Sequence, residues 1–354
     1  MKTIYGFLIM IFMTMNISGQ QKGKDRDPVV AGSFYPAGKS ELLRQLGQMF
    51  EEAAVLVSFN IKPEEKVRAI IAPHAGYVFS GTVAASAYGC IPKDAEYDNI
   101  FLIGSSHRVS FPGASVYTKG NYLTPLGTVT VNTELGEELI DNSKLFSYYS
   151  SAHSSEHSLE VQVPFLQYHL GDNIRIVPIV LGTQNSKVCK EIADALKPYF
   201  NENNLFVISS DFSHYPPFDK AVEIDKKTVE ALISGDPDKF LRTLRDNSNM
   251  NIEGLATSMC GWTSGLVLLH LAMNEPELEF KHILYRNSGH SSYGDRSSVV
   301  GYNSVVLIHK DFKNKKNTDF SIEYEDQQKL LEIARESIRS YLYKDKLPEI
   351  KESE

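Results

Sequence analysis

The chain has 354 residues, of which 42% are hydrophobic, and a formal net charge of −8 at pH 7. This composition excludes global disorder and provides for one large α/β domain or two ordinary ones. The negative charge and the lack of a long basic run argue against a nucleic-acid partner. They favour a small-molecule, peptide or protein ligand instead.

The N-terminal segment is typical of a secretory signal peptide. Lys2 precedes an apolar stretch over 4–17, which small and polar residues follow. We predict a signal peptide and linker over 1–26, and export to the periplasm or the outside of the cell. The apolar stretch is short for a membrane span, and no second segment could form one. A retained anchor, or a cytoplasmic protein, is the alternative.

From about 27 to 312, short apolar strands alternate with segments of helical spacing. Helices are expected over 40–53 with Ser40 as cap, 80–90, 133–142, 158–170 with a kink or a late start forced by Pro164, 186–200, 225–247 as two short helices, and 260–273. Strands are expected over 69–72, 100–106, 121–131 as a hairpin or edge, 174–181, 205–210, 281–286 and 299–309. This alternation predicts an α/β fold with a mainly parallel central sheet flanked by helices.

Residues 313–354 have a different composition. A polar linker over 313–317 precedes an amphipathic helix expected over 322–343. A lone helix buries little surface, so it must dock on its own domain or on a partner.

Three expected strands end in residues that bind metals or transfer protons. His74 and His107 follow two of them, and Asp211 follows a third, with His214 three residues later. Cys260 opens an apolar helical run, where the helix dipole favours a thiolate. Ligands of α/β sheets bind outside the carboxyl ends of the strands, so we expect one converging site.

Each of these residues also has a structural interpretation. A single strand-end histidine is more often held by backbone groups than bound to a metal, and Cys260 could be an inert buried thiol, as expected for Cys90 and Cys189. For Asp211 and His214, the alternative to an acid/base pair is a capping aspartate with a surface histidine.

Other polar residues are candidates for the lining of the pocket. Glu156 and Glu160 are four apart and would share a helix face, although a solvated acidic helix start explains them equally well. His157 and His153 are candidates for the mouth of the site, and His290 lies in a Gly- and Ser-rich loop that could reach it.

Two imidazoles and a thiolate make a three-ligand metal site with open positions. With a carboxylate in place of the thiolate, the set matches the facial arrangement of non-haem iron oxygenases. With zinc, it matches hydrolytic or dehydrogenase-type sites. The ligands are far apart in the sequence, so spacing does not choose between these possibilities.

From about Pro28 to His309 the sequence resembles the Memo family (mediator of cell motility), which includes the bacterial AmmeMemoRadiSam system protein B. Six motifs carry the resemblance: Gly32–Pro36, Ala72–Tyr77, Gly104–His107, Glu156–Glu160, Ser209–His214 and Cys260–Gly261. Each motif alone is unspecific, but together they are specific.

The resemblance implies a fold similar to the B subunit of class III extradiol dioxygenases. It implies His74, His107 and Cys260 as metal ligands, with Asp211 and His214 as further pocket residues. An iron or copper ion is implied, zinc being an alternative, and with it a redox, dioxygenase-like activity. A non-catalytic peptide- or metal-binding module and a zinc or thiol hydrolase are the alternatives.

Animal members of the family have been proposed to bind phosphotyrosine peptides. Phe34, a candidate pocket residue, stands where those members have Trp, and Phe79 stands where they have Tyr. His290 stands where relatives often have Asp.

The tail carries a second resemblance. Residues 326–338 are similar to the first helix of an AMMECR domain, which many bacteria fuse behind a Memo domain alongside a radical-SAM protein. The resemblance implies a truncated AMMECR domain, or a partner of that type.

Overall fold

A computed structural model describes residues 24–58, 61–62, 64–310 and Lys329. The signal peptide expected over 1–26 falls mostly outside these residues, as does the C-terminal helix apart from Lys329. Export and the AMMECR-type segment therefore stay predictions from the sequence. Within the described residues, no helix has both the length and the hydrophobicity that a membrane crossing requires. The compact unit that carries the site ends at Lys310.

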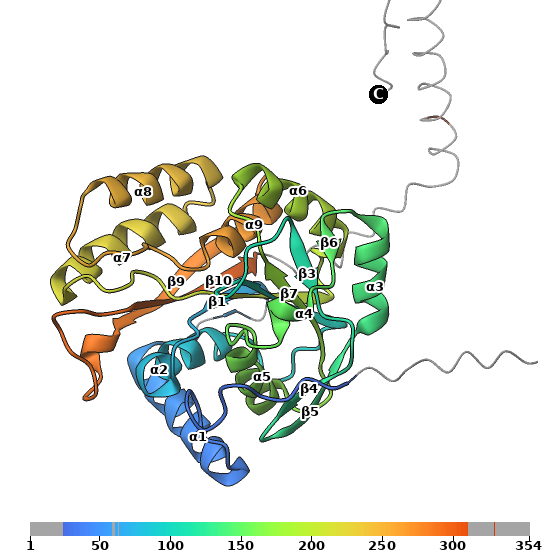
Figure 1. Ribbon diagram of the computed structural model, residues 1–354, viewed down its shortest axis with the longest axis horizontal. Helices are drawn as coiled ribbons and strands as arrows, with labels where there is room; N and C mark the ends of the chain where they lie inside the picture. Colours follow the sequence, from blue (N-terminus) through green and yellow to red (C-terminus); the bar gives the residue numbers. More distant parts are fainter. Residues whose placement is uncertain (1–23, 59–60, 63, 311–328, 330–354) are drawn as a thin grey trace, which may run out of the picture. The chain divides into compact units, whose positions relative to one another are not determined.

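A mixed, mostly parallel sheet forms the centre of this unit (Figure 1). Four parallel strands lie side by side in its middle, in the order β7 (Arg175–Leu181), β2 (Asn99–Ser105), β8 (Asn204–Ser209) and β1 (Lys66–Ala72). Apart from the first residues of β7, β2 and β1, every residue of these strands is buried, as expected for a sheet covered on both faces. The predicted parallel core is confirmed.

The edges of the sheet are antiparallel. Next to β1 lie β10 (Gly301–His309) and then β9 (Leu278–Asn287), both antiparallel to their neighbours. At the other edge, β4 (Tyr122–Thr124) and β5 (Gly127–Val131) form the predicted hairpin. Two short strands, β3 (Ala114–Val116) and β6 (Phe146–Ser147), lie beside β7 and were not predicted.

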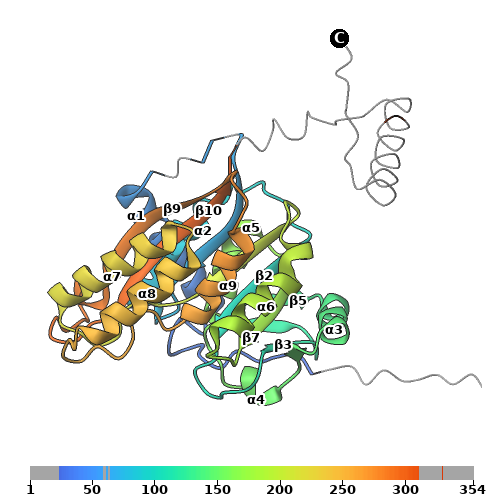
Figure 2. The same ribbon diagram turned by 90° about the horizontal axis from the view of Figure 1, so that it is seen from above.

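Helices cover both faces of the sheet (Figures 1 and 2). One face carries α1 (Lys39–Leu56), α2 (Tyr77–Tyr88) and α5 (Val163–Leu170). The other carries α6 (Ser186–Leu196), α7 (Phe218–Ile233), α8 (Pro237–Asn249) and α9 (Trp262–Ala272). Two short helices, α3 (Thr133–Asn142) and α4 (Ser150–His153), complete the unit. Each face has its own buried apolar core, so the sheet is held from both sides.

Several helix boundaries differ from the prediction. Helix α1 begins at Lys39 with Gly38 as its N-cap, so Ser40 lies inside the first turn and is not the cap. Helix α7 begins at Phe218, earlier than expected. Pro164 lies in the first turn of α5, so the helix starts late, which was one of the two predicted effects of this proline. Proline is tolerated there because a backbone N–H in the first turn has no acceptor within the helix. A 3₁₀ turn, η1 (Glu160–Gln162), precedes it.

Candidate metal centre

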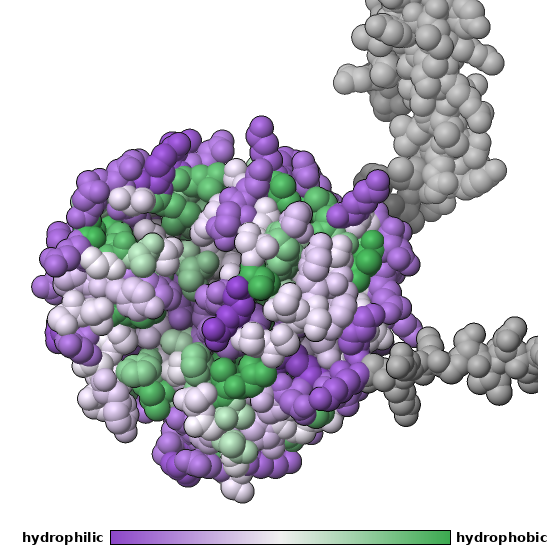
Figure 3. All heavy atoms as spheres, in the orientation of Figure 1, coloured by the Kyte–Doolittle hydropathy of each residue, from purple (hydrophilic) through white to green (hydrophobic). Residues whose placement is uncertain are grey.

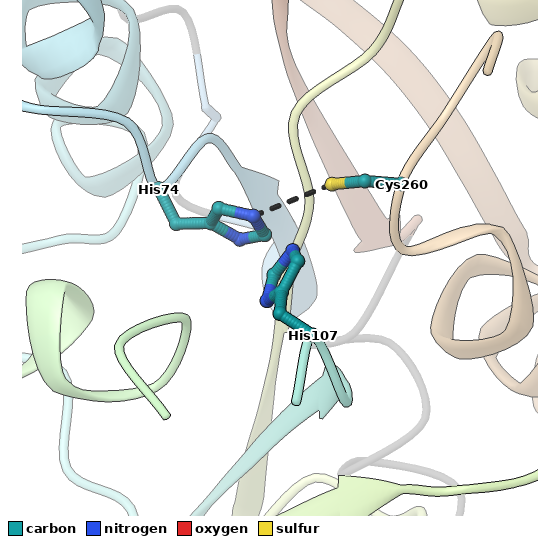
Figure 4. Close-up of side chains that lie close together, drawn as sticks. All are labelled: His74, His107 and Cys260. Atoms are coloured by element: carbon teal, nitrogen blue, oxygen red, sulfur yellow. Dashed lines mark hydrogen bonds between the residues drawn. The ribbon is translucent and has the colours of Figure 1, made fainter. Parts of the chain in front are cut away.

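Three neighbouring parallel strands bring the predicted site residues to one edge of the sheet. His107 follows β2 and His74 follows β1, while Asp211 follows β8, which lies between them. Cys260 comes from the loop before α9. One ligand atom from each of His74, His107 and Cys260 lies within 4.8 Å of the others (Figure 4). The expectation of one converging cluster is confirmed by this geometry.

Cys260 reaches the cluster because the chain packs closely just after it. Gly261 is the N-cap of α9, so Cys260 precedes the helix rather than starting it. A Cβ on Gly261 would lie 2.6 Å from the Cβ of Ser210, so only glycine fits. The Gly261 amide donates to Ser210 Oγ at 2.8 Å. The Cys260 sulfur then lies 3.3 Å from His74 Nε2.

His74 is held in one orientation by a buried hydroxyl. Its Nδ1 lies 2.9 Å from Ser209 Oγ. That hydroxyl gives its only hydrogen to the Ser158 carbonyl at 2.6 Å and accepts from Gln162 Nε2 at 2.8 Å. His74 Nδ1 must therefore be the donor, which leaves the lone pair of Nε2 facing the Cys260 sulfur. Neither Ser209 nor Gln162 was predicted from the sequence to have this role.

Burial keeps the His74 imidazole neutral. The side chain is 2% exposed. Burial, then repulsion from His107 and other histidines, lowers the pKa of His74 well below its usual range. The Nε2 lone pair of this neutral ring faces the Cys260 sulfur at 3.3 Å. A neutral imidazole is also the form that binds metal ions.

His107 is held by a carboxylate. Its Nδ1 lies 2.9 Å from Oε1 of Glu156, and its amide donates to Oε2 at 2.7 Å. Burial opposes protonation of His107, but contacts with Cys260 and Glu156 outweigh it and raise its pKa to about 10. In Figure 4 one ring nitrogen of His107 points toward His74 and Cys260. Since Glu156 holds Nδ1, Nε2 is the nitrogen available to a metal.

Glu156 is buried, which contradicts the interpretation of a solvated acidic helix start. It is 2% exposed and lies in a loop, not on a helix face shared with Glu160. The amides of His157 and Ser158 also donate to its Oε1, each at 3.0 Å. Burial opposes its ionisation, but the hydrogen bonds and charge of His107, with the backbone amides, lower the pKa of Glu156 to about 2. Glu156 is therefore a permanently charged partner for His107.

Glu160 holds the N-terminal segment to the same loop. Its Oε2 accepts from Arg26 Nη1 at 2.7 Å, and its Oε1 accepts from the Tyr35 hydroxyl at 2.8 Å. Arg26 also donates to the carbonyl of Glu156 at 2.6 Å. The fold thus includes Arg26, one residue before the expected boundary at 27. This buried ion pair secures the loop that supplies Glu156.

A second group with ligand spacing consists of His107, Glu156 and His157. It is the weaker candidate, because both oxygens of Glu156 already accept hydrogen bonds from the protein. His157 instead packs on its neighbours, with ring centroids 4.9 Å from those of both Phe34 and His107. Phe34 and His157 therefore lie beside the cluster, and their role as pocket-lining residues stays a prediction.

Asp211 joins the backbones of two candidate ligands. Its Oδ1 accepts from the His74 amide at 2.7 Å, and its carbonyl accepts from the Cys260 amide at 3.2 Å. Burial raises the pKa of its carboxyl group. Nδ1 of His214 donates to the Phe212 carbonyl at 2.9 Å, so the backbone, rather than Asp211, orients this ring. In its neutral form His214 therefore carries a lone pair on Nε2.

Two histidines contact other parts of the chain. His290 is exposed in η3 (Ser288–His290), where its Nδ1 accepts from the Asn287 amide and its ring packs on Phe218. His153 is buried, with Nε2 2.9 Å from Ser115 Oγ. Cys90 and Cys189 are buried as predicted, and burial raises the pKa of each thiol to about 12.

These observations define the class: an α/β protein with a candidate two-histidine, one-cysteine metal centre at the carboxyl ends of parallel strands. Residues 26–306 match the family model described as "Memo-like protein". The chain therefore belongs to the Memo-like family, and this part of the sequence-based resemblance is confirmed.

Archaeal relatives support the same assignment. The chain is 34% identical over 289 residues to "MEMO1 family protein TV1383" of Thermoplasma volcanium, covering 79% of this chain and 97% of the relative. It is 35% identical over 287 residues to "MEMO1 family protein Ta0237" of Thermoplasma acidophilum, covering 80% and 98%. A solved structure, "uncharacterized protein JW3007" from Escherichia coli K12, is similar at a TM-score of 0.42 and 13% identity, covering 67% of this chain and 98% of that one. The last likeness is too weak to assign an activity.

Proposed function

We propose that this Memo-family protein binds an iron or copper ion through His74, His107 and Cys260 and carries out dioxygenase-like redox chemistry on a small molecule or peptide. One observation carries the proposal. Two imidazoles and one thiol converge within 4.8 Å, and a separate buried group holds the Nδ1 atom of each imidazole. Such fixed ring orientations are typical of metal-binding histidines.

The donor set fits a metal ion. With metal–nitrogen distances of about 2.0–2.1 Å and metal–sulfur distances of about 2.3 Å, two ligand atoms at tetrahedral to right angles lie roughly 3.1–3.6 Å apart. His74 Nε2 and Cys260 Sγ, at 3.3 Å, already have this separation. A soft thiolate beside imidazoles suits copper, iron or zinc better than a hard cation such as magnesium.

The residues of the chain divide the remaining tasks. Cys260 would hold the metal as a thiolate, while Glu156 and Ser209 keep the two imidazoles in position. A bound iron or copper ion would supply one-electron redox chemistry at this edge of the sheet. His214, with Nε2 free when neutral, is the proposed acid/base, and buried Asp211 keeps His74 and Cys260 together. The proposal includes a fold similar to that of the B subunit of class III extradiol dioxygenases.

Metal analysis of anaerobically purified protein tests the site. We expect bound iron or copper in the wild type, and its loss in the H74A/H107A/C260A variant. C189A, which removes a buried thiol outside the cluster, is the matched control and should keep the metal. Equal metal content in the wild type and the triple variant would contradict the assignment.

Absorption spectroscopy separates a redox site from a zinc site. Copper(II) or iron(III) bound to a cysteine thiolate gives a charge-transfer band in the visible region, and zinc gives none. We expect this band in oxidised wild type and C189A, and its absence in C260A. Zinc as the only metal, with no oxygen consumption on any oxidisable substrate, would refute the redox part and favour a hydrolase or a binding module.

The tail motif supports a finer assignment, to AmmeMemoRadiSam system protein B, and a partner of the AMMECR type. We expect a separately expressed AMMECR domain to bind the full chain and to lose affinity when residues 313–354 are removed. Equal binding before and after truncation would refute a role for the tail.

A further inference from the structure

A pocket lies between α8 and the chain that leads into the candidate metal centre. Its volume is about 290 Å³, at the lower end of the range for ligand pockets. Helix α8 lines it with Leu241, Leu244 and Arg245, which share one helix face. Leu255 and Trp262 also line it. In Figure 3, hydrophobic surface is visible between the positions that α8 and α9 occupy in Figure 1.

The lining combines apolar walls with one cation. Leu241, Leu244 and Trp262 are only partly buried, so they expose apolar surface that a ligand could cover. Arg245 is exposed. No carboxylate forms a salt bridge with it in the part of the domain that the structure describes, 24–58, 61–62 and 64–310. Its neighbour on α8, Arg242, is paired with Asp236 at 3.9 Å.

This pocket is separate from the metal cluster but shares a segment of chain with it. Ala256 and Thr257 line the pocket, and their backbones pair with that of His214 through hydrogen bonds of 3.0 Å each. Met259, also in the lining, directly precedes Cys260. A molecule in the pocket would therefore contact the segment that positions two proposed site residues.

We propose that this pocket binds a small amphipathic carboxylate, with its apolar chain on the leucines and its carboxylate on Arg245. The volume limits the occupant to roughly the size of a medium-chain fatty acid. The guanidinium matches a carboxylate in charge and in two-point hydrogen-bonding geometry. The proposal does not depend on which metal the neighbouring site holds, or on whether it holds one.

Trp262 provides a direct probe, because it lines the pocket and is the only tryptophan in the chain. Its indole is held by a hydrogen bond to Gln184 Oε1 at 3.0 Å. Full-length protein is titrated with octanoate below its critical micelle concentration, and tryptophan fluorescence is recorded. We expect a saturable change in intensity, and a weaker response to 1-octanol, which has the same chain without the charge.

Variants of the two arginines test recognition of the carboxylate. R245M should weaken octanoate binding about fivefold, because partly exposed charge pairs contribute no more than about 1 kcal/mol. R245K should retain part of the affinity. R242M, one turn away on the same helix, should bind like the wild type. Circular dichroism of each variant confirms the fold.

Three results would overturn the proposal. The first is a fluorescence that octanoate leaves unchanged, which would show that nothing binds beside Trp262. The second is equal affinity for octanoate and 1-octanol, which would show a purely apolar site. The third is an equal loss of affinity in R242M and R245M, which would reveal general electrostatic attraction instead of a specific contact.

Discussion

The carboxylate of Glu156 binds His107 at two points, its amide at 2.7 Å and its ring Nδ1 at 2.9 Å. One buried side chain therefore sets both the backbone and the ring orientation of a candidate metal ligand. Because the two residues are 49 positions apart, this contact also joins the end of β2 to the loop before η1.

Replacing Glu156 with Gln should weaken metal binding by about 10- to 100-fold, the usual effect of losing a partner of a metal-binding histidine. Gln keeps the size of the side chain but lacks the charge and one acceptor oxygen. Competition with a chromophoric chelator measures the affinity. E253Q, a substitution at an exposed site, is the control. Unchanged affinity in E156Q would show that Glu156 does not support the ligand.

Ser209→Ala should misorient His74 and destabilise the fold. The change leaves the Nδ1 donor of His74 and an amide hydrogen of Gln162 without their acceptor, at a cost of about 1–3 kcal/mol. Metal affinity should fall as well. S86A removes a buried hydroxyl that pairs with Ser304, outside the cluster. If S86A loses a comparable amount of stability but keeps normal metal affinity, the loss of metal affinity in S209A does not come from lower stability alone. Unaltered metal affinity in S209A would contradict the role of Ser209.

Arg26→Met should lower the free energy of unfolding by about 3–5 kcal/mol, because it leaves buried Glu160 without its counter-ion. The side chains of this pair are 5% and 1% exposed, so added salt should not mask the loss. The double variant R26M/E160M should be more stable than R26M, since it removes the unpaired charge. Urea unfolding of the wild type and of both variants measures these differences. A double variant no more stable than R26M would refute the argument from the unpaired charge.

Asp225 should make stability fall as the pH rises. Burial raises the pKa of its carboxyl to about 7 from a usual value of 3.8, despite hydrogen bonds from Ser213 and Tyr285. Because the pKa is higher in the folded state, Asp225 contributes its full stabilisation of the fold below about pH 3.8, where it is protonated. That contribution is lost as the pH rises through about 7. The total loss is no more than about 4 kcal/mol at 1.36 kcal/mol per pKa unit.

Urea unfolding at pH 5 and pH 8 tests this pH dependence. Between pH 5 and pH 8 the free energy of unfolding should fall more in the wild type than in D225N, because Asn cannot ionise. His107 also contributes in this range, since its raised pKa stabilises the folded state at low pH and that contribution is lost toward pH 10. Comparing the two proteins cancels the His107 term. Equal pH dependence in both would exclude Asp225 as a source.

Much of the fold follows from local patterns in the sequence. Buried strands read as continuous apolar runs, and the predicted parallel strands before His74, His107 and Asp211 were all found. The predictions were wrong mainly at the starts of helices, where capping depends on the conformation of the preceding turn. For example, Gly38 rather than Ser40 caps α1. The short strands β3 and β6 were missed because three or two residues carry too little periodicity.

The sequence by itself identified His74, His107 and Asp211 as candidate site residues, since each follows an apolar run. Only the tertiary structure decided how they combine. The order β2-β8-β1 brings His107 and His74 to either side of Asp211. The close packing of Gly261 on Ser210 places Cys260 beside His74, 186 positions away in the chain. The tertiary structure also makes Glu156, which the sequence indicated only as a candidate pocket-lining residue, the buried partner of His107. Such roles depend on strand order and close packing between distant segments, which local propensity does not encode.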